Sequence, residues 1–340
     1  MSHSTFSFNT TAEEVATAFA DYIRGKNVLV TGCSIGGIGH ETARVVAKHA
    51  NLVIITGHNS DRLKLAQEAI KKEIPSANIR PLILDLSSSL SAVRKAAAEV
   101  NLFPEPLHVL IHNAAANVEG FKLTVDNLET QMATNHVGPF LFTKLIAPKL
   151  LAARTEEYTP RVVSVSSGGH ILASGVNFDT LVRPDPALYA PMDAYAQSKS
   201  ANILCAIELT KRAGGSIHAY SLAPGRVFTS LMQKGDGTVE MQKLGILGPD
   251  GQPLSGKGFK TIPQGAATTV VAAFDPSLNG ELYSMWPHFF VSHTNADTPG
   301  AYLSDCVVAN QLVAPHSSDL NNAERLWVLT EQIINEPFVF

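Results

Sequence analysis

Short runs of continuous apolar residues alternate with amphipathic helical patterns over most of the chain, and this alternation limits the fold more than any other feature. The apolar runs cover residues 27–30, 52–56, 79–84, 107–112, 161–165 and 217–222, and the helical patterns cover residues 41–49, 61–73, 91–100, 127–151 and 194–213. A strand that is apolar along its whole length is buried on both faces, which requires helices on both sides of a parallel sheet. We therefore predict an α/β fold with a doubly wound parallel sheet.

The segments around this core are expected to belong to the same domain. A capping-box sequence followed by apolar residues at helical spacing predicts an N-terminal helical extension over residues 1–25. Residues 26–340 are predicted to form one nucleotide-binding domain, which helices at 263–274 and 321–334 close. Residues 231–262 are rich in glycine, lysine and proline and have little periodicity, which favours a lid loop in front of the C-terminal extension.

Composition and charge exclude several classes of protein. The chain is 45% hydrophobic and 16% charged, and its formal charge of -4 contains no long run of either sign, so we expect a globular protein without a nucleic-acid partner. No signal peptide and no run of about 18 apolar residues is present, so we expect no membrane anchor and a cytoplasmic location. No metal site or disulfide framework is expected, because the histidines lack ligand spacing and the cysteines are far apart, at Cys33, Cys205 and Cys306.

A glycine-rich turn, TGCSIGGIG, begins at Thr31 directly after the first apolar run. Gly32, Gly37 and Gly39 stand where a strand-to-helix turn needs glycine for a dinucleotide pyrophosphate to approach the backbone. The helix that follows would offer amide donors and a favourable dipole to this phosphate. The alternative is an ordinary tight turn, but its position after the first core strand favours a Rossmann-type dinucleotide site.

The end of the second apolar run carries the residues that distinguish two dinucleotides. An acidic residue at this place binds the 2′-hydroxyl of NAD, whereas a basic residue accommodates the 2′-phosphate of NADP. The sequence TGHNSDR at 56–62 has no acid directly at the strand end, and His58, Asn59 and Arg62 can hydrogen-bond a phosphate. NADP(H) is therefore favoured over NAD(H), the alternative being a solvated loop and first helical turn.

Tyr195 and Lys199 form a pair within a helical pattern. A spacing of four residues places both side chains on one face of a helix, so they can act together. A phenol is a weak base at neutral pH, and a neighbouring ammonium would favour the phenolate. Lys199 is thus expected to activate Tyr195 for proton transfer, although the same spacing also occurs in surface pairs.

Together these segments resemble the short-chain dehydrogenase/reductase superfamily over residues 26–335. Six of its motifs occur in the family's order. The matching positions are the glycine turn, Asn113-Ala114-Ala115, Asn135, Ser167, Tyr195 with Lys199, and Pro224-Gly225 with Val227 and Thr229. The phrases NFDTL, AYAQSKSANIL, QGAATTV and AYLSDC further look like its retinol-dehydrogenase-like branch.

The resemblance implies a role for each matching residue. Ser167 would stabilise the substrate oxygen, with Ser166 as second choice, and Tyr195 would exchange a proton with that oxygen. Lys199 would lower the pKa of Tyr195 and bind the nicotinamide ribose, and Asn135 would hold a water that links Lys199 to solvent. The cofactor-binding residues are expected to be Gly32, Ser34, Ile35, Gly37, Ile38, Gly39, His58, Asn59, Arg62, Asp85, Leu86, Asn113, Ala114, Tyr195, Lys199, Pro224, Gly225, Val227 and Thr229.

Three features depart from the family's pattern. The glycine turn has one residue more, with Gly36 and Gly37 in place of a single glycine, which leaves open which amide faces the pyrophosphate. Ala115 replaces the glycine of the NAG motif. Residues 281–299 read as an insertion, which could line a substrate mouth, form an interface or be a surface loop.

These observations lead us to expect an oxidoreductase that interconverts a ketone or aldehyde and the alcohol, as a homodimer or homotetramer. The resemblance implies an interface through the helices carrying Asn135 and Tyr195, which the C-terminal segment could block. A lipophilic or aromatic substrate is expected because apolar residues precede Tyr195, namely Leu172, Phe178, Leu188, Tyr189 and Met192. The alternatives are a non-redox dehydratase, epimerase or cyclase with this fold, and an NADP(H)-binding regulator without turnover.

Overall fold

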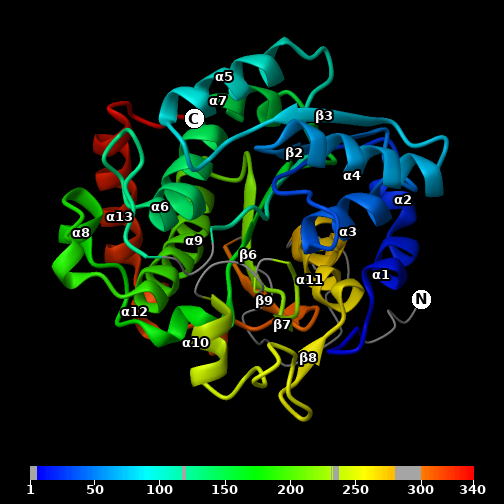
Figure 1. Ribbon diagram of the computed structural model, residues 1–340. Coiled ribbons are helices and arrows are strands. Elements are labelled where there is room, and N and C mark those ends of the chain that lie inside the picture. Colours follow the sequence, from blue (N-terminus) through cyan, green and yellow to red (C-terminus); the bar gives the residue numbers. More distant parts are fainter. Residues whose placement is uncertain (1–5, 117–119, 231, 233–236, 280–299) are drawn as a thin grey trace, which may run out of the picture.

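An eight-stranded sheet runs through the structure in the order β10-β9-β6-β5-β4-β1-β2-β3 (Figure 1). The computed structural model describes residues 6–116, 120–230, 232, 237–279 and 300–340. The neighbouring strands are parallel except β9 and β10, which pair antiparallel. The strands are β1 Asn27–Val30, β2 Leu52–Gly57, β3 Ile79–Ile83, β4 Val109–His112, β5 Arg161–Val165, β6 His218–Ala223, β9 Tyr302–Ser304 and β10 Val307–Val308.

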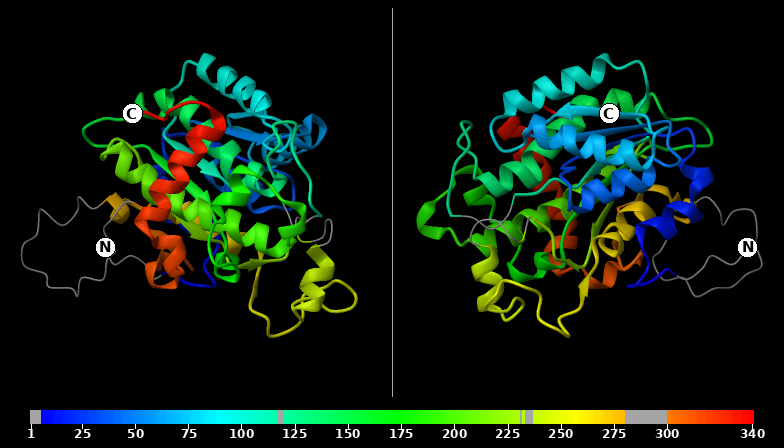
Figure 2. Two further views of the ribbon diagram at one scale, coloured as in Figure 1. Left: turned by 90° about the vertical axis from the view of Figure 1, so that its left-hand side faces the viewer. Right: turned by 45° about the vertical axis from the view of Figure 1, so that its right-hand side comes forward.

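Helices cover both faces of this sheet, as predicted (Figure 2). One face carries α3 Ile38–Val46, α4 Ser60–Glu73 and α11 Ile262–Phe274, with α1 Ala12–Ala18 and α2 Ala20–Ile23 packed outside. The other carries α5 Leu90–Leu102, α7 Gly138–Leu151, α9 Pro191–Ala213 and α13 Leu320–Ile334. The doubly wound, Rossmann-type fold predicted from the sequence is therefore confirmed.

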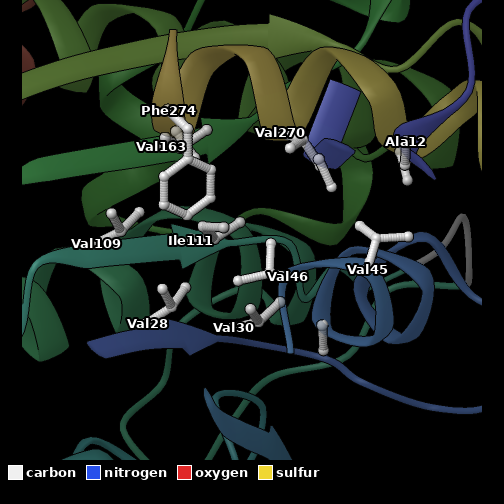
Figure 3. Close-up of a cluster of buried hydrophobic side chains, with 14 of the residues drawn as sticks. Ala12, Val28, Val30, Val45, Val46, Val109, Ile111, Val163, Val270 and Phe274 are labelled. Atoms are coloured by element: carbon white, nitrogen blue, oxygen red, sulfur yellow. The ribbon is translucent and has the colours of Figure 1, made fainter. Parts of the chain in front are cut away.

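The strands are buried on both sides because successive side chains enter two different cores. Val28 and Val30 of β1 point into the core beneath α3 and α11, whereas Leu29 between them points into the core beneath α7 and α9. Figure 3 shows the first of these cores, in which Val28 and Val30 lie near Val46 and Ile111. A strand with core on both faces needs no polar alternation, which is why the sequence showed continuous apolar runs.

The N-terminal extension contains the expected capping box at Thr11 and Glu14, but its helix is broken. α1 ends at Ala18, and a separate short helix, α2, follows Phe19. The apolar side of this extension is buried against the outer side of α3 and α11 and belongs to the same hydrophobic cluster. The boundary at residue 25 is therefore visible in the sequence, but in the structure residues 6–25 pack against the rest of the domain.

One further prediction about the elements was wrong. The continuous helix over residues 127–151 is replaced by a short α6, Thr130–Met132, a π-helical turn, Ala133–Val137, and then α7. The sheet also extends beyond β6 through β9 and β10, which the sequence did not reveal because they have only three and two residues.

The segment predicted as a lid loop contains regular structure. α10, Gly237–Lys243, and β8, Phe259–Lys260, lie within residues 231–262, and β8 pairs with β7, Arg226–Val227. A role as a lid stays a prediction. The insertion predicted at 281–299 lies outside the described residues, and among the described helices none has both the length and the apolar character to cross a membrane.

Candidate active site

The predicted site residues converge on the edge of the sheet where the parallel strands end. The glycine turn follows β1, His58 follows β2, Asp85 follows β3, Asn113 follows β4, and Ser166 follows β5. Carboxyl ends of parallel strands lie on the same edge, and ligands of open α/β sheets bind outside that edge. The turns that follow these strands therefore form the candidate site.

The glycine turn requires glycine at two positions for different reasons. Gly32 has a φ of +73°, and a Cβ there would lie 2.7 Å from the Cα of Ala114. A Cβ on Gly39 would lie 2.3 Å from Nδ2 of Asn113 and 2.6 Å from the carbonyl oxygen of Gly32. Both positions allow the turn to pack directly against the segment that follows β4.

The additional residue of the turn is accommodated by Gly36. This glycine has a φ of +77° and open space around its Cα, so its role is conformational. Gly37 is the N-cap of α3, and no side chain caps the helix there. The first amides of α3 are left for an anion, which suits a helix N-terminus facing a phosphate.

The expected phosphate-binding residues lie together at the end of β2. His58, Asn59 and Arg62 are all exposed, and Asn59 caps α4 by accepting a hydrogen bond from the amide of Arg62 at 2.9 Å. His58 is close enough to Asp85 for its charge to lower the pKa of that carboxyl, although hydrogen bonds from Ser87 contribute more against the opposing effect of burial. The edge therefore offers an imidazole, an amide and a guanidinium to a ligand.

The residues expected to contact adenosine lie at this edge, but two of them also stabilise the protein itself. Asn113 donates from Nδ2 to the carbonyl oxygens of Thr31 and Gly32, at 2.9 and 3.1 Å. The side chain of Leu86 is buried, and its Cδ2 would lie 3.1 Å from a Cβ added to Gly138. Direct contacts of Asp85, Leu86 and Asn113 with a nucleotide stay predictions.

Tyr195 and Lys199 lie on one face of α9, as their spacing predicts. The Nζ atom of Lys199 is 5.6 Å from the centre of the Tyr195 ring and donates to the carbonyl oxygen of Val165 at 2.9 Å. Lys199 is buried, with 2% of its surface exposed, and Tyr195 is partly buried. The pair is therefore held against the end of β5.

The two serines at the end of β5 make different contacts. The Ser167 oxygen accepts from the amide of Gly169 at 3.0 Å, and it lies beside the Tyr195 ring, since Ser167 Oγ and Tyr195 Cε1 would lie 3.3 and 3.4 Å from a Cβ at Gly169. The Ser166 hydroxyl donates to the carbonyl oxygen of Lys199 at 2.7 Å and is buried. The structure thus brings Ser167 together with Tyr195, and it places Ser166 beneath the helix backbone.

Asn135 lies in the π-helical turn and connects two segments of the site. Its Oδ1 accepts from the amide of Ala116 at 2.7 Å, and its Nδ2 donates to the Ser198 hydroxyl at 2.9 Å. Ser198 in turn donates to the carbonyl oxygen of Tyr195 at 2.7 Å. Because π-turns often mark functional positions, this irregular turn supports a positioning role for Asn135.

Burial sets the proton affinities at this site. It raises the pKa of the Tyr195 phenol, and the hydrogen bond with Ser167 opposes this in part. It also lowers the pKa of Lys199 from 10.5 to about 8. Burial is the largest influence on both groups, and the expectation that Lys199 lowers the pKa of Tyr195 stays a prediction.

The turn after β6 is supported by a lysine that the sequence analysis missed. A Cβ added to Gly225 would lie 2.9 Å from Cδ of Lys260, which is 3% exposed. The Nζ atom of Lys260 lies 2.5 Å from Oδ1 of Asp305 in the β9 to β10 turn. No motif marks this pair, so only the fold reveals that it supports the segment carrying Pro224, Val227 and Thr229.

Two other residues of the site were missed although their positions in the sequence pointed to them. The Thr31 hydroxyl accepts from the amides of Asn113 and Ala114, at 3.0 and 2.9 Å, and thereby joins the turns after β1 and β4. Ser198 links Asn135 to α9. Both stand inside quoted motifs, at the first residue of the glycine turn and directly before Lys199.

The apolar residues that precede Tyr195 do not all face this site. Leu172 follows Ser167 and is 60% exposed, whereas Leu188 and Tyr189 line a pocket between α6 and α9. The ring of Phe178 lies 4.3 Å from the Arg325 guanidinium. These apolar residues are therefore spread over more than one surface, and a lipophilic or aromatic substrate stays a prediction.

Comparisons with known proteins agree with the geometry of this edge. A sequence model described as short chain dehydrogenase matches residues 26–176. The chain is 33% identical over 291 residues to the short-chain dehydrogenase TIC 32 B, chloroplastic, of Brassica napus, with 84% of this chain and 85% of that protein covered. It is 32% identical over 255 residues to the human polyprenol dehydrogenase, with 74% and 73% covered.

A solved structure extends the likeness to nearly the whole chain. The crystal structure described as a putative uncharacterized protein from Mycobacterium paratuberculosis superimposes with a TM-score of 0.65 at 26% identity. The superposition covers 94% of this chain and 96% of the mycobacterial one. The retinol-dehydrogenase-like branch stays a prediction.

Proposed function

The chain belongs to the short-chain dehydrogenase/reductase family, and on this premise we propose that it is an NADP(H)-dependent oxidoreductase that interconverts a lipophilic or aromatic carbonyl and its alcohol. The observation that carries the proposal is that Ser167 and Tyr195 lie side by side where β5 ends: Ser167 Oγ and Tyr195 Cε1 would lie 3.3 and 3.4 Å from a Cβ at Gly169. Lys199, on the same face of α9, completes a set of proton-transferring groups. A dehydrogenase needs such a set beside a dinucleotide.

The residues around the glycine turn fit NADP(H). When bound, this cofactor supplies or accepts the hydride. The uncapped amides at the start of α3 would hold the pyrophosphate, and His58, Asn59 and Arg62 would hold the 2′-phosphate. No acid directly follows β2 at Gly57, which supports NADP(H) over NAD(H).

In the direction of reduction, Tyr195 donates its proton to the substrate oxygen. Its raised pKa keeps the phenol protonated at neutral pH, so the proton is available when charge develops on that oxygen. The Ser167 hydroxyl donates a hydrogen bond to the same oxygen and stabilises the developing charge. In oxidation the proton returns to Tyr195.

Lys199 and Asn135 support Tyr195 from inside the protein. The lowered pKa of Lys199, about 8, lets this amine give up or take a proton near neutral pH. Asn135 fixes the start of α9 through Ser198 and fixes the segment after β4 through Ala116. We propose that these two residues keep the phenol oriented and restore its proton.

The surroundings of Ser167 support an apolar substrate. Ile171 and Leu172 lie in the 3-10 helix that begins after Ser167, Gly168–Leu172, and are 59% and 60% exposed. Exposed large apolar side chains next to a catalytic edge favour contact with an apolar ligand. The human relative is itself named for a polyprenol.

The test is a titration of the purified protein with NADPH and NADH, followed by turnover on a panel of aromatic and aliphatic ketones and aldehydes. We expect NADPH to bind more tightly, and we expect Tyr195→Phe to reduce turnover by at least about 100-fold while NADPH binding is retained. Cofactor binding without turnover on the panel would instead favour a regulator or a non-redox enzyme, and absence of binding would refute the proposal.

A matched pair of variants tests the preference for NADPH over NADH. Arg62→Gln should weaken NADPH binding by about tenfold and leave NADH binding unchanged, because the loss of one charged hydrogen bond is worth about 1.5 kcal/mol. Lys64→Gln removes the same charge from the same helix at a side chain that is 74% exposed and should change neither affinity. Equal losses for both cofactors would refute the assignment of Arg62.

A further inference from the structure

A second pocket lies beside the candidate active site, between α6, the start of α9 and the segment that joins β5 to α9. Its cavity volume is about 50 Å³, and it is open to solvent. Asp193 and Gln197 line it from α9. Each is two residues from Tyr195, and at about 100° per residue they point away from the Tyr195 side of the helix by about 200°. We call this the α6–α9 pocket, and it is separate from the catalytic edge.

The walls of the α6–α9 pocket are apolar and come from three elements. Met132 belongs to α6, Leu181 to α8 (Phe178–Val182), and Leu188 to the 3-10 helix Pro186–Leu188. Phe121 and Tyr189 also line it and contact each other edge to face, with ring centres 5.3 Å apart. Leu188 is 67% exposed, so an occupant would remove a large apolar side chain from water.

Acidic side chains provide the charge of this pocket. Glu129, Asp185 and Asp193 line it, and no lysine or arginine does so among the described residues. Glu129 accepts from the amides of Gln131 and Met132, at 2.9 and 2.8 Å, and Asp193 accepts from Nε2 of Gln197 at 2.5 Å. These donors are neutral, so they leave the negative charge of the carboxylates uncompensated.

The pKa of Glu129 is consistent with a site that would bind a cation. Burial raises the pKa of this carboxyl, even though the amides of Gln131 and Met132 and the Tyr189 hydroxyl oppose the rise. A cation placed against a carboxylate in a partly desolvated site gains a charge-assisted hydrogen bond and restores the ionised form. An uncharged or anionic occupant would gain neither.

The α6–α9 pocket also contacts the elements that hold two candidate catalytic residues. Met132 and Val137 line the pocket and stand on either side of the buried Asn135 in the π-helical turn. Ala194 lines it and directly precedes Tyr195. An occupant would therefore press on the backbone of both segments without touching the reacting atoms.

We propose that the α6–α9 pocket is an effector site for a lipophilic ammonium ion. Its hydrocarbon part lies among Phe121, Met132 and Leu188, and its ammonium group lies between the carboxylates of Glu129 and Asp193. Binding is independent of the function proposed above. The change in turnover that it causes, through Asn135 and Tyr195, rests on that function.

The probes are 4-phenylbutylamine, 4-phenylbutyramide and 4-phenylbutyrate, which share a phenyl ring on a four-carbon chain and differ in the charge of the end group. Calorimetry on the protein without cofactor should show the amine binding at least about tenfold more tightly than the amide, and the carboxylate not at all. Equal binding of amine and amide would show a merely apolar occupant and would overturn the proposal. Because no cofactor or substrate is needed, failure here is distinguishable from failure of the oxidoreductase assignment.

Variants locate the binding to this pocket. Glu129→Gln keeps an oxygen that can accept from the amides of α6, and we expect it to weaken amine binding by about tenfold, as should Asp193→Asn. Glu156→Gln removes an exposed carboxylate away from the pocket and should change nothing. If Glu129→Gln unfolds the chain, Leu188→Arg at the exposed mouth should abolish amine binding by repulsion, and unchanged binding in that variant would overturn the proposal.

Discussion

Two adjacent serines at the end of β5 offer the sharpest test of individual roles. Ser167 lies beside the Tyr195 ring, whereas the Ser166 hydroxyl donates to the backbone of α9. We expect Ser167→Ala to lower kcat for carbonyl reduction by about 100-fold, because a donor to the developing oxyanion is lost. Ser166→Ala should keep kcat within about twofold and lower the free energy of unfolding by about 1 kcal/mol. Steady-state kinetics and urea unfolding of both variants check this, and the reverse ranking would assign the role to Ser166.

The lowered pKa of Lys199 should make the stability of the cofactor-free protein depend on pH. Burial lowers its pKa from 10.5 to about 8 in the folded protein, while the unfolded chain keeps the higher value. The unfolded state therefore binds more protons between these values, and the stability of the folded state rises with pH through that window. Relative to Lys199→Met, the wild type should gain about 2.5 kcal/mol between about pH 7 and about pH 10.

Urea unfolding of wild type and Lys199→Met at several pH values measures this difference. The Met variant should be the more stable of the two near neutral pH, although it loses activity, because it removes an ionised group from the interior. A difference that does not change with pH would show that the folded protein leaves the proton affinity of Lys199 unchanged.

At the scale of elements, the sequence predicted those strands, helices and turns that leave a long apolar run or a glycine pattern. The six parallel strands from β1 to β6 and their covering helices were found, because core on both faces leaves a continuous apolar signal. β9 was missed because three residues show no period, and its place beside β6 depends on tertiary pairing. The break between α1 and α2 at Phe19 likewise has no local signal.

The site was predictable to the extent that its residues stand in motifs. Tyr195, Lys199 and Ser167 lie together, yet the π-helical turn around Asn135 was read as ordinary helix. Its extra residue is accommodated by contacts of Asn135 with Ala116 and Ser198, which are distant in sequence. Tertiary hydrogen bonds of this kind, and the ion pair of Lys260, produce no periodic pattern in the sequence, so they could not be predicted from it.

The N-terminal extension provides a prediction at this scale. Phe19, between α1 and α2, is 2% exposed and meets Phe6 edge to face at 5.7 Å, whereas Tyr22 on α2 is 51% exposed. We propose that the extension unfolds together with the rest of the domain. Phe19→Ala should then lower the free energy of unfolding by about 3 kcal/mol, since it leaves a cavity in the main core. Tyr22→Ala, the matched change at an exposed aromatic ring, should cost within about 0.5 kcal/mol.

Denaturant unfolding, followed by a probe of the whole fold such as circular dichroism, tests this proposal. A single transition that shifts for Phe19→Ala is expected. A small separate transition, with the main one unchanged, would instead make residues 1–25 an independent appendage.

At the scale of the whole molecule, the C-terminal helix determines which surface is left for other copies of the chain. α13 packs along α9 (Figures 1 and 2). Its Trp327 is 2% exposed and meets Phe140 of α7 at 4.6 Å between ring centres. Phe338 stacks on Trp327 at 5.1 Å, and the Arg212 guanidinium of α9 lies 5.2 Å from the same ring. The groove between α7 and α9 is therefore filled from within the chain.

This arrangement bears on the dimer or tetramer that the family resemblance implied. An interface through α7 and α9 would have to displace α13 and expose Trp327, Phe140 and Phe338, and exposure of each aromatic side chain costs about 2 kcal/mol or more. Keeping α13 packed on α7 and α9 is therefore more favourable than replacing it with a second copy of the chain. We expect a monomer of 36.3 kDa at micromolar concentration. Light scattering coupled to size exclusion measures this mass directly. A mass twice as large would contradict the prediction, and it would require an interface on a surface that α13 leaves free.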